Sequence, residues 1–332
     1  MRMKTEILKL LRETDGYVSG QQISRQFGVS RTAVWKVIRQ LQEEGYQVEA
    51  VRNKGYHIVD SPDVMTKEEI SSLMNTRWAG RNILYYDVTD STNLRIKQAG
   101  DEGAPHGTLA VADRQTAGRG RRGRTWESPA GSSIYMSILL RPEIAPNKAS
   151  MLTLVMALSV AEGIRQCISQ PGCPELQIKW PNDVIINGKK VVGILTEMSS
   201  QIDYINHVTV GVGINVNMTD FPEEIAQTAT SLRIECGHTA KRAPLIAAVM
   251  ERLEENYETF LETEDLSGLL DGYSALLVNR DRDVQIIGAK ETYRAHAIGI
   301  NNTGELIVRR ENGDIEKINA GEVSVRGVYG YV

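Results

Sequence analysis

The sequence predicts a chain of the α/β (α+β) class built from several domains, and three patterns along its 332 residues support this prediction. Residues 1–60 are typical of a winged helix-turn-helix, because short capped helices are followed by a basic hairpin. Residues 64–278 alternate β-like runs with long apolar helices, which indicates an α/β domain. Residues 281–332 contain short strands between glycine and asparagine turns, which predicts a small SH3-like β-barrel.

Composition and charge exclude several classes of protein. Apolar residues make up 41% and charged residues 24% of the chain, unlike a disordered chain, a collagen-like repeat or a coiled-coil rod. The net charge of -4 is unevenly divided: residues 1–60 carry 10 Lys and Arg against 7 Asp and Glu, and the remainder carries 28 against 35. A basic N-terminal segment (the head, residues 1–60) on an acidic remainder (the body) suggests that the head binds a polyanion.

The cysteines, the histidines and the apolar runs suggest no metal, disulfide or membrane chemistry. Three cysteines without CxxC spacing and five scattered histidines predict neither a disulfide framework nor a zinc site, and no metal ligands are expected. The N-terminus lacks the apolar core of a signal peptide, and the longest apolar run, residues 151–161, is too short to span a bilayer. We therefore expect a cytoplasmic protein with no membrane partner.

The head has helix signals in the right order for DNA binding. Apolar residues at helical spacing predict a first helix over residues 3–13. Ser19 can cap a short second helix, Gly28 suits the left-handed residue that ends it, and Ser30 can cap a third. Two helices joined by a glycine-containing turn, the second with basic and polar residues at its N-terminal end, form the helix-turn-helix pattern.

A basic hairpin follows the third helix. Residues 45–51 and 56–59 alternate as strands around a basic turn, so cations stand on the helix and at the hairpin tip. Attraction to phosphates needs such cations, and DNA binding is therefore the predicted role of the head. The alternative is a winged helix used only for protein contacts. The predicted DNA-binding residues are Ser30, Arg31, Thr32, Trp35, Lys36, Arg39, Arg52 and Lys54.

The body begins with β-like runs at 83–87 and 108–113, and a polar stretch follows the first of them. Ser91, Thr92 and Asn93 offer two hydroxyls and an amide where a helix over residues 94–100 begins. Such groups can hydrogen-bond a polar head group at a helix N-terminus. Ordinary N-capping of the helix is the alternative.

A basic loop over residues 113–124 contains five Arg and three Gly. Its spacing matches neither a Walker loop nor a Rossmann fingerprint. Planar guanidinium groups on a flexible loop are suited to close over a carboxylate and a phosphate. A solvated basic loop without a role is the alternative.

Further along the body, β-like runs at 133–140 and 208–214 flank a long apolar helix at 147–168. Lys179 is the only base in its strand, so it either reaches solvent at an edge or is held for an anion. A turn at 181–183 and a hairpin at 187–188 follow, and glycines in 211–217 would let a ligand approach the backbone.

Taken together, these blocks resemble the biotin–protein ligases, specifically the bifunctional class that doubles as the biotin operon repressor. The resemblance covers essentially the whole chain, including the winged head that monofunctional ligases lack. The matching blocks are Ser91-Thr-Asn93, Gln115-Thr-Ala-Gly-Arg-Gly-Arg-Arg-Gly-Arg124, Lys179-Trp-Pro-Asn-Asp183 with Gly193-Ile-Leu, and Gly211-Val-Gly-Ile-Asn215.

The resemblance implies a class II synthetase-like mixed sheet with helices and a reaction in two steps. Biotin and ATP, with Mg²⁺, give biotinyl-5′-adenylate and pyrophosphate. A lysine of the biotin carboxyl carrier protein domain of an acetyl-CoA or pyruvate carboxylase then attacks the adenylate. The adenylate is also implied as the corepressor of a homodimer on operator DNA that controls biotin biosynthesis and transport genes.

The family also implies roles for individual residues. Catalytic roles fall to Lys179, which contacts carboxylate and phosphate oxygens, to Arg121, and to Asp183, which orients or deprotonates the incoming lysine. Biotin-binding residues are Ser91, Thr92, Asn93, Gln115, Arg119, Gly120, Arg121 and Lys179. The adenylate loop comprises Gly118, Arg119, Gly120, Arg121, Arg122, Gly123, Arg124 and Trp126. Nucleotide-binding residues are Asn182 and Asn215.

The end of the chain predicts a helix around residues 245–261 and then five short strands. The strands are expected at residues 283–287, 292–300, 306–310, 315–319 and 323–326. The family also has an SH3-like domain there, which supports the nucleotide site and the encounter with the carrier protein.

Two other functions remain open from the sequence. The first is a non-catalytic biotin-sensing transcription factor, which would not need the cationic loop together with Lys179. The second is a ligase for a related acyl group such as lipoate, against which the Gly118–Gly123 loop favours biotin.

Overall fold

A computed structural model of the chain describes residues 2–168, 172–288, 291–320, 324–327 and 331–332. Contacts between residues divide it into two compact units, the first made of residues 1–74 with 241–247 and the second of residues 75–240 with 248–332. The three domains proposed from the sequence, 1–60, 64–278 and 281–332, stay a prediction. Among the described residues, no helix has both the length and the apolar content needed to cross a membrane.

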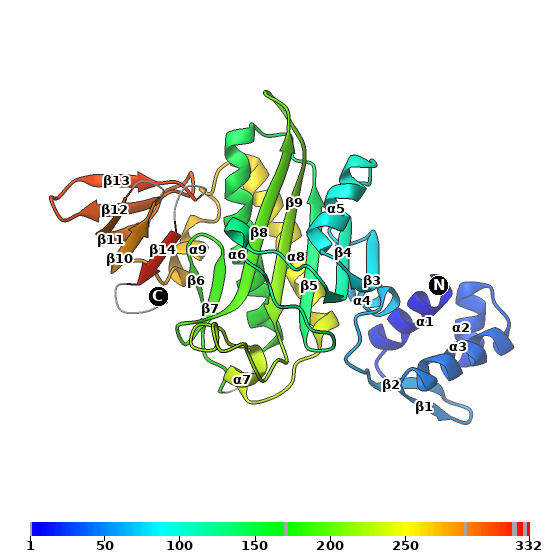
Figure 1. The fold of residues 1–332 in the computed structure, drawn as a ribbon. Coiled ribbons are helices and arrows are strands. Elements are labelled where there is room, and N and C mark those ends of the chain that lie inside the picture. Colours follow the sequence, from blue (N-terminus) through cyan, green and yellow to red (C-terminus); the bar gives the residue numbers. More distant parts are fainter. Residues whose placement is uncertain (1, 169–171, 289–290, 321–323, 328–330) are drawn as a thin grey trace. The chain divides into compact units, whose positions relative to one another are not determined.

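Residues 2–60 of the first unit form a winged helix-turn-helix, drawn in blue in Figure 1. The predicted caps are confirmed: the Ser19 and Ser30 hydroxyls accept from backbone N–H groups at the starts of α2 and α3, and Gly28 has a left-handed φ of 65°. The elements of the first unit are α1 (Arg2–Glu13), α2 (Gly20–Phe27), α3 (Arg31–Glu43), β1 (Gln47–Val51), β2 (Gly55–Asp60) and α4 (Lys67–Leu73).

The second unit is built on a seven-stranded mixed sheet with the order β3-β4-β5-β9-β8-β7-β6. Only the β3–β4 pair is parallel, and the mixed sheet predicted for the body is confirmed. The strands are β3 (Ile83–Thr89), β4 (Leu109–Gln115), β5 (Ser133–Leu140), β6 (Leu176–Lys179), β7 (Asp183–Ile186), β8 (Lys189–Ser200) and β9 (Ile205–Asn215).

Helices cover both faces of this sheet (Figure 1). On one face, Asn93 at the start of α5 donates a hydrogen bond to Glu197 of β8. On the other face, Thr153 at the start of α6 donates a hydrogen bond to Thr196 of β8. Adjacent residues of a strand point to opposite faces, so α5 and α6 lie on opposite sides. The helical segments are α5 (Thr92–Asp101), η1 (Arg121–Gly123), η2 (Pro146–Met151), α6 (Leu152–Cys167), α7 (Leu232–Cys236), α8 (Arg242–Thr263, which begins in the first unit) and α9 (Leu270–Leu276).

The C-terminal part of the second unit is a five-stranded antiparallel sheet with the order β13-β12-β11-β10-β14. The predicted strands are confirmed, apart from residue 323, which lies outside the described residues. They are β10 (Arg282–Ile287), β11 (Thr292–Ile300), β12 (Leu306–Arg310), β13 (Ile315–Ile318) and β14 (Ser324–Gly327).

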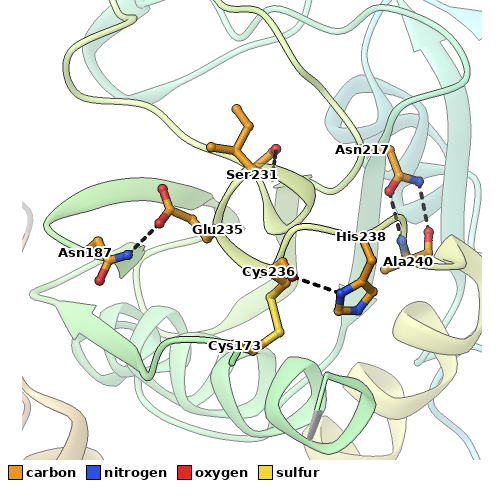
Figure 2. Close-up of a disulfide and its surroundings, with 9 residues drawn as sticks. Cys173, Asn187, Asn217, Ser231, Glu235, Cys236, His238 and Ala240 are labelled. Atoms are coloured by element: carbon orange, nitrogen blue, oxygen red, sulfur yellow. Dashed lines mark hydrogen bonds between the residues drawn. A yellow bond between two sulfur atoms is a disulfide. The ribbon is translucent and has the colours of Figure 1, made fainter. Parts of the chain in front are cut away.

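The expectation of no disulfide is wrong. Figure 2 shows Cys173, just before β6, bonded to Cys236 at the end of α7, with a Cα–Cα distance of 4.5 Å. The two cysteines are 63 positions apart in the sequence, and only folding brings them together. An odd number of cysteines without close spacing carries no signal of such a long-range pair.

Candidate functional site

Glycines at the centre of the sheet make room for two side chains. A Cβ at Gly211 of β9 would lie 1.9 Å from Asn93 Oδ1, and a Cβ at Gly213 or at Gly193 of β8 would lie 2.6 Å from the Trp126 indole. The sequence predicted that the glycines of β9 admit a ligand. In this structure they make room for Asn93 and Trp126, and Gly211 and Gly213 also line a small cavity.

The buried polar residues at the start of α5 form a hydrogen-bonded network with neighbouring strands. The Thr92 N–H and hydroxyl both donate to Gln115 Oε1, at 2.8 and 3.1 Å. The Ser137 hydroxyl of β5 lies 2.6 Å from Asn93 Oδ1, and Asn93 Nδ2 donates to Glu197 Oε2 at 2.7 Å. Buried polar groups are normally paired in this way.

Ser91 occupies the N-cap position of α5, but its side chain makes no capping hydrogen bond. Simple capping therefore does not account for this hydroxyl. Ser91 lines a small cavity of about 50 Å³ together with Thr92, Asn93 and Gln115. The remaining walls are Arg119, Gly120, Arg121, Trp126, Met136, Asn182, Lys190, Gly193, Ile194, Leu195, Gly211, Val212 and Gly213.

The basic loop is folded back on itself at the edge of this cavity. Gly120 N–H donates to the Arg124 carbonyl at 2.7 Å, and Trp126 N–H donates to the Gly118 carbonyl at 3.0 Å. Within the turn, Arg122 has a φ of 57°, which a non-glycine residue rarely adopts. Arg122 and Arg124 are exposed to solvent.

Arg121 anchors the basic loop to the rest of the unit. Its Nη1 donates to Asn182 Oδ1 at 2.8 Å, and its Nη2 donates to the Ala320 carbonyl at 2.7 Å. Burial lowers the pKa of the guanidinium, which the Asp183 carboxylate partly opposes. A guanidinium stays protonated at neutral pH, so Arg121 brings a fixed positive charge to the cavity wall.

A larger cavity of about 360 Å³ adjoins the basic loop. Gly120, Arg121, Trp126, Asn182 and Lys190 line both cavities, so the two share a wall. The other residues of the larger cavity are Arg122, Arg124, Thr125, Glu127, Lys179, Trp180, Pro181, Asp183, Asn215, Met218, Phe221, Pro222, Glu224, Ile225, Thr228, Ala229, Val325, Arg326 and Tyr331.

Lys179 is the buried cation of the larger cavity. Its side chain stands at the end of β6, opposite Asp183 of β7 in the strand register. Burial lowers the pKa of Lys179 to about 8; the Asp183 carboxylate opposes this shift, and Lys190, Arg326 and Arg124 add to it. In the described part of the chain, no carboxylate oxygen lies within 4.0 Å of its Nζ.

Asp183 is bound by other groups. Lys190 Nζ lies 2.6 Å from its Oδ1, and the Tyr331 hydroxyl donates to its Oδ2. Burial raises the pKa of Asp183, but Lys190, the Tyr331 hydrogen bond and Lys179 together hold it below its ordinary value. Asp183 is therefore an anion already paired with a cation.

The two asparagines predicted to bind a nucleotide both reach the larger cavity. Asn182 Nδ2 donates to the Ile194 carbonyl at 3.0 Å, and Asn215 Nδ2 donates to the Thr230 carbonyl at 3.0 Å. The structure thus brings the predicted residues of the body together around two joined cavities, apart from Gly118 and Gly123 of the basic loop, which line neither. Sequence reasoning missed Ser137, Glu197, Lys190 and Tyr331, which come from strands or a terminus without a motif.

The predicted DNA-binding residues lie on the surface of the first unit. All eight are exposed. On α3, the Trp35 side chain is 51% exposed and the Arg39 guanidinium lies 5.4 Å from its ring centroid. At the tip of the β1–β2 hairpin, a Cβ at Gly55 would lie 2.1 Å from the Val18 carbonyl, so the wing packs against the backbone there.

Models of known families match three stretches of the chain. The model of the "Biotin/lipoate A/B protein ligase family" matches residues 85–215, an "HTH domain" model matches residues 4–57, and a "Biotin protein ligase C terminal domain" model matches residues 281–326.

Relatives and solved structures agree with these matches. The "Bifunctional ligase/repressor BirA" of Bacillus subtilis is 37% identical over 97% of this chain and 98% of its own length, and that of Escherichia coli is 32% identical over 98% and 99%. A biotin protein ligase from Aquifex aeolicus in complex with biotin and ATP superposes with a TM-score of 0.65 at 33% identity, over 74% of this chain and 99% of that one. The chain therefore belongs to the family of the bifunctional BirA ligase/repressors.

Proposed function

We propose that this chain joins biotin to ATP as biotinyl-5′-adenylate, transfers biotin to a lysine of a biotin carboxyl carrier protein, and represses transcription through its winged head. One observation carries the enzymatic part. Among the described residues, no carboxylate oxygen lies within 4.0 Å of the buried Lys179 ammonium, which lines a cationic cavity that shares a wall with a small polar cavity. Two mutually repelling anions can be brought together in such a place.

The small cavity is the proposed site of the biotin head. Its hydroxyl and amide groups, supplied by Ser91, Thr92, Asn93 and Gln115, match the donors and acceptors of a ureido ring. A volume of about 50 Å³ holds only a few water molecules, so Trp126 or the basic loop must shift to admit the ring.

The larger cavity is the proposed nucleotide site. Lys179, Lys190, Arg124 and Arg326 line it, and they complement a triphosphate. In the first step, a carboxylate oxygen of biotin bonds to the α-phosphorus and the bond to pyrophosphate breaks. The cations screen the two negative groups and hold them in line.

In the second step, the amine of the carrier lysine attacks the acyl carbon, AMP leaves with the bonding electrons, and the amine loses a proton. Because Asp183 is paired with Lys190 and has a lowered pKa, its contacts favour orienting the amine over accepting its proton. No covalent enzyme intermediate is needed.

Magnesium is proposed to arrive with the nucleotide. The described residues contain no cluster of three His, Cys, Asp or Glu side chains that could hold a metal ion. Magnesium at ATP sites is commonly bound through the phosphates with one or two carboxylates, and Glu127 and Glu224 of the larger cavity are of the right type.

Incubation with labelled biotin, ATP and a carrier domain of acetyl-CoA or pyruvate carboxylase tests this function. A ligase labels one lysine of the carrier and releases AMP and pyrophosphate. A sensor without catalysis binds biotin and releases no pyrophosphate, and a ligase for a related acyl group accepts lipoate in preference to biotin.

The head is proposed to hold operator DNA through phosphate contacts. Arg31→Ala on α3 or Lys54→Ala at the wing tip is expected to weaken binding and to reduce the slope of log K against log salt by about one. Gel-shift titrations at several salt concentrations measure both effects. Lys67→Ala, an exposed cation on α4, is the control, and an unchanged slope for both head variants would exclude phosphate contacts there.

Repression is proposed to depend on a homodimer that forms when the adenylate is bound. A two-fold operator is matched by a two-fold protein, and ordering of the basic loop by the adenylate would couple ligand to dimer. Sedimentation with biotin and ATP is expected to show a doubling of mass relative to the free protein. A mass that stays the same with and without ligands rules this mechanism out.

A further inference from the structure

Tyr331, the penultimate residue of the chain, contacts both charged residues at the end of the β6–β7 hairpin. Its hydroxyl donates to Asp183 Oδ2, and its ring centroid lies 3.3 Å from Lys179 Nζ. No sequence motif singled out this position. The two contacts come from one half-buried side chain, separated from Asp183 by 148 positions in the chain.

The strand register makes this arrangement unusual. Lys179 and Asp183 are directly opposite each other in the β6–β7 pair, where opposite charges ordinarily attract. Asp183 instead has one oxygen on Lys190 and the other on Tyr331. Each oxygen of Asp183 is thus held by a residue other than Lys179, and neither oxygen lies within 4.0 Å of Lys179 Nζ.

The tyrosine ring replaces the missing carboxylate without cancelling the charge. The face of an aromatic ring attracts an ammonium through its quadrupole but carries no net charge. Lys179 is therefore held in a fixed place while its positive charge remains available to an anion. The Tyr331 ring does not fill the space around Lys179, because both residues line the larger cavity, which has a volume of about 360 Å³.

We propose that Tyr331 is a positioning residue of the ligase reaction: by binding Asp183 and stacking on Lys179, it keeps the Lys179 ammonium unpaired and held at the nucleotide cavity. This proposal rests on the proposed function of Lys179. It predicts that losing the hydroxyl releases Asp183 Oδ2 to pair with Lys179.

The test compares Tyr331→Phe, which keeps the ring, with Tyr331→Leu, which removes it, in the full-length protein. Tyr293→Phe is the matched control, because the Tyr293 hydroxyl also donates to a carboxylate, Glu316 at 2.7 Å, and its ring also faces a cation, Arg310 at 3.8 Å, away from the cavity. Biotin-dependent pyrophosphate release gives kcat, the KM for ATP and the pH profile of each variant.

We expect Tyr331→Phe to lower kcat by about 10-fold or more, as for loss of a hydrogen bond to a charged group. The alkaline limb of the pH profile should move to higher pH, because closer pairing with Asp183 raises the pKa of Lys179. The neighbouring cations Lys190, Arg326 and Arg124 lower that pKa and oppose this shift. Tyr331→Leu should lose more activity, while Tyr293→Phe keeps both the rate and the profile.

A second readout needs no activity. In protein with ¹³C-labelled lysine, the Lys179 signal, assigned by its absence from Lys179→Arg, should titrate near pH 8 and at higher pH in Tyr331→Phe. An unchanged titration overturns the proposal, as does reduced activity with an unchanged pH profile. If Lys179→Ala keeps full activity while Tyr331→Phe shifts the Lys179 titration, the proposed catalytic role of Lys179 is wrong. The positioning of Lys179 by Tyr331 is then still supported.

Discussion

Lys179→Ala is expected to abolish adenylate formation while the protein keeps its fold. The substitution removes the one buried ammonium among the described cations of the larger cavity, which we place between the biotin carboxylate and the α-phosphate. A preorganised donor aimed at developing charge is commonly worth about 10²–10³-fold in rate. We therefore expect biotin-dependent pyrophosphate release to fall by at least about 10²-fold.

Two measurements separate this chemical loss from a structural one. A buried charge is costly to desolvate, so its removal should leave the thermal midpoint of unfolding unchanged or raised. Lys97→Ala, which removes an exposed ammonium on α5, should retain full activity. Pyrophosphate release by Lys179→Ala at the wild-type rate would refute the role.

Arg121→Gly is expected to let the adenylate escape and acylate lysines of bystander proteins. The variant loses the two hydrogen bonds that tie the basic loop to Asn182 and to the Ala320 carbonyl. Hydrogen bonds from a charged donor contribute about 1.5–3 kcal/mol each, so losing two should favour the open loop by about 10²-fold or more. Biotin labelling of an added unrelated protein should rise by at least about 10-fold.

The same loop provides the control for this experiment. Arg114→Ala removes a guanidinium of the basic loop that is exposed and lines neither cavity. It should label bystanders no more than the wild type does. Undiminished retention of the adenylate by Arg121→Gly in a filter-binding assay would contradict the assigned anchor.

The elements of this protein could be predicted where local chemistry decides them. Ser19, Gly28 and Ser30 mark the ends of helices in the head. They do so through hydrogen bonds and backbone angles that depend only on residues nearby in the sequence. The strands of the C-terminal sheet are likewise separated by turn residues such as Gly304 and Gly313, both with positive φ. Such signals can be recognised in a few consecutive residues of the sequence.

The charge arrangement of the site could not be predicted in this way. Lys190 reaches Asp183 through the pairing of β7 with β8, and Tyr331 reaches it from the far end of the chain. The missing side chain of Gly211 makes room for Asn93 from α5, a contact that the sequence did not indicate. Each of these facts depends on which segments become neighbours in the folded sheet.

The Cys173–Cys236 bond has a mechanical consequence for how substrates enter. It ties the chain leading into the strand that ends at Lys179 to the helix that follows the segment over residues 218–229 on the cavity wall. While the cross-link is intact, those two sides cannot swing far apart at that point. The Arg121 side of the cavity is held instead by hydrogen bonds to Asn182 and to the Ala320 carbonyl, which can open without breaking a covalent bond.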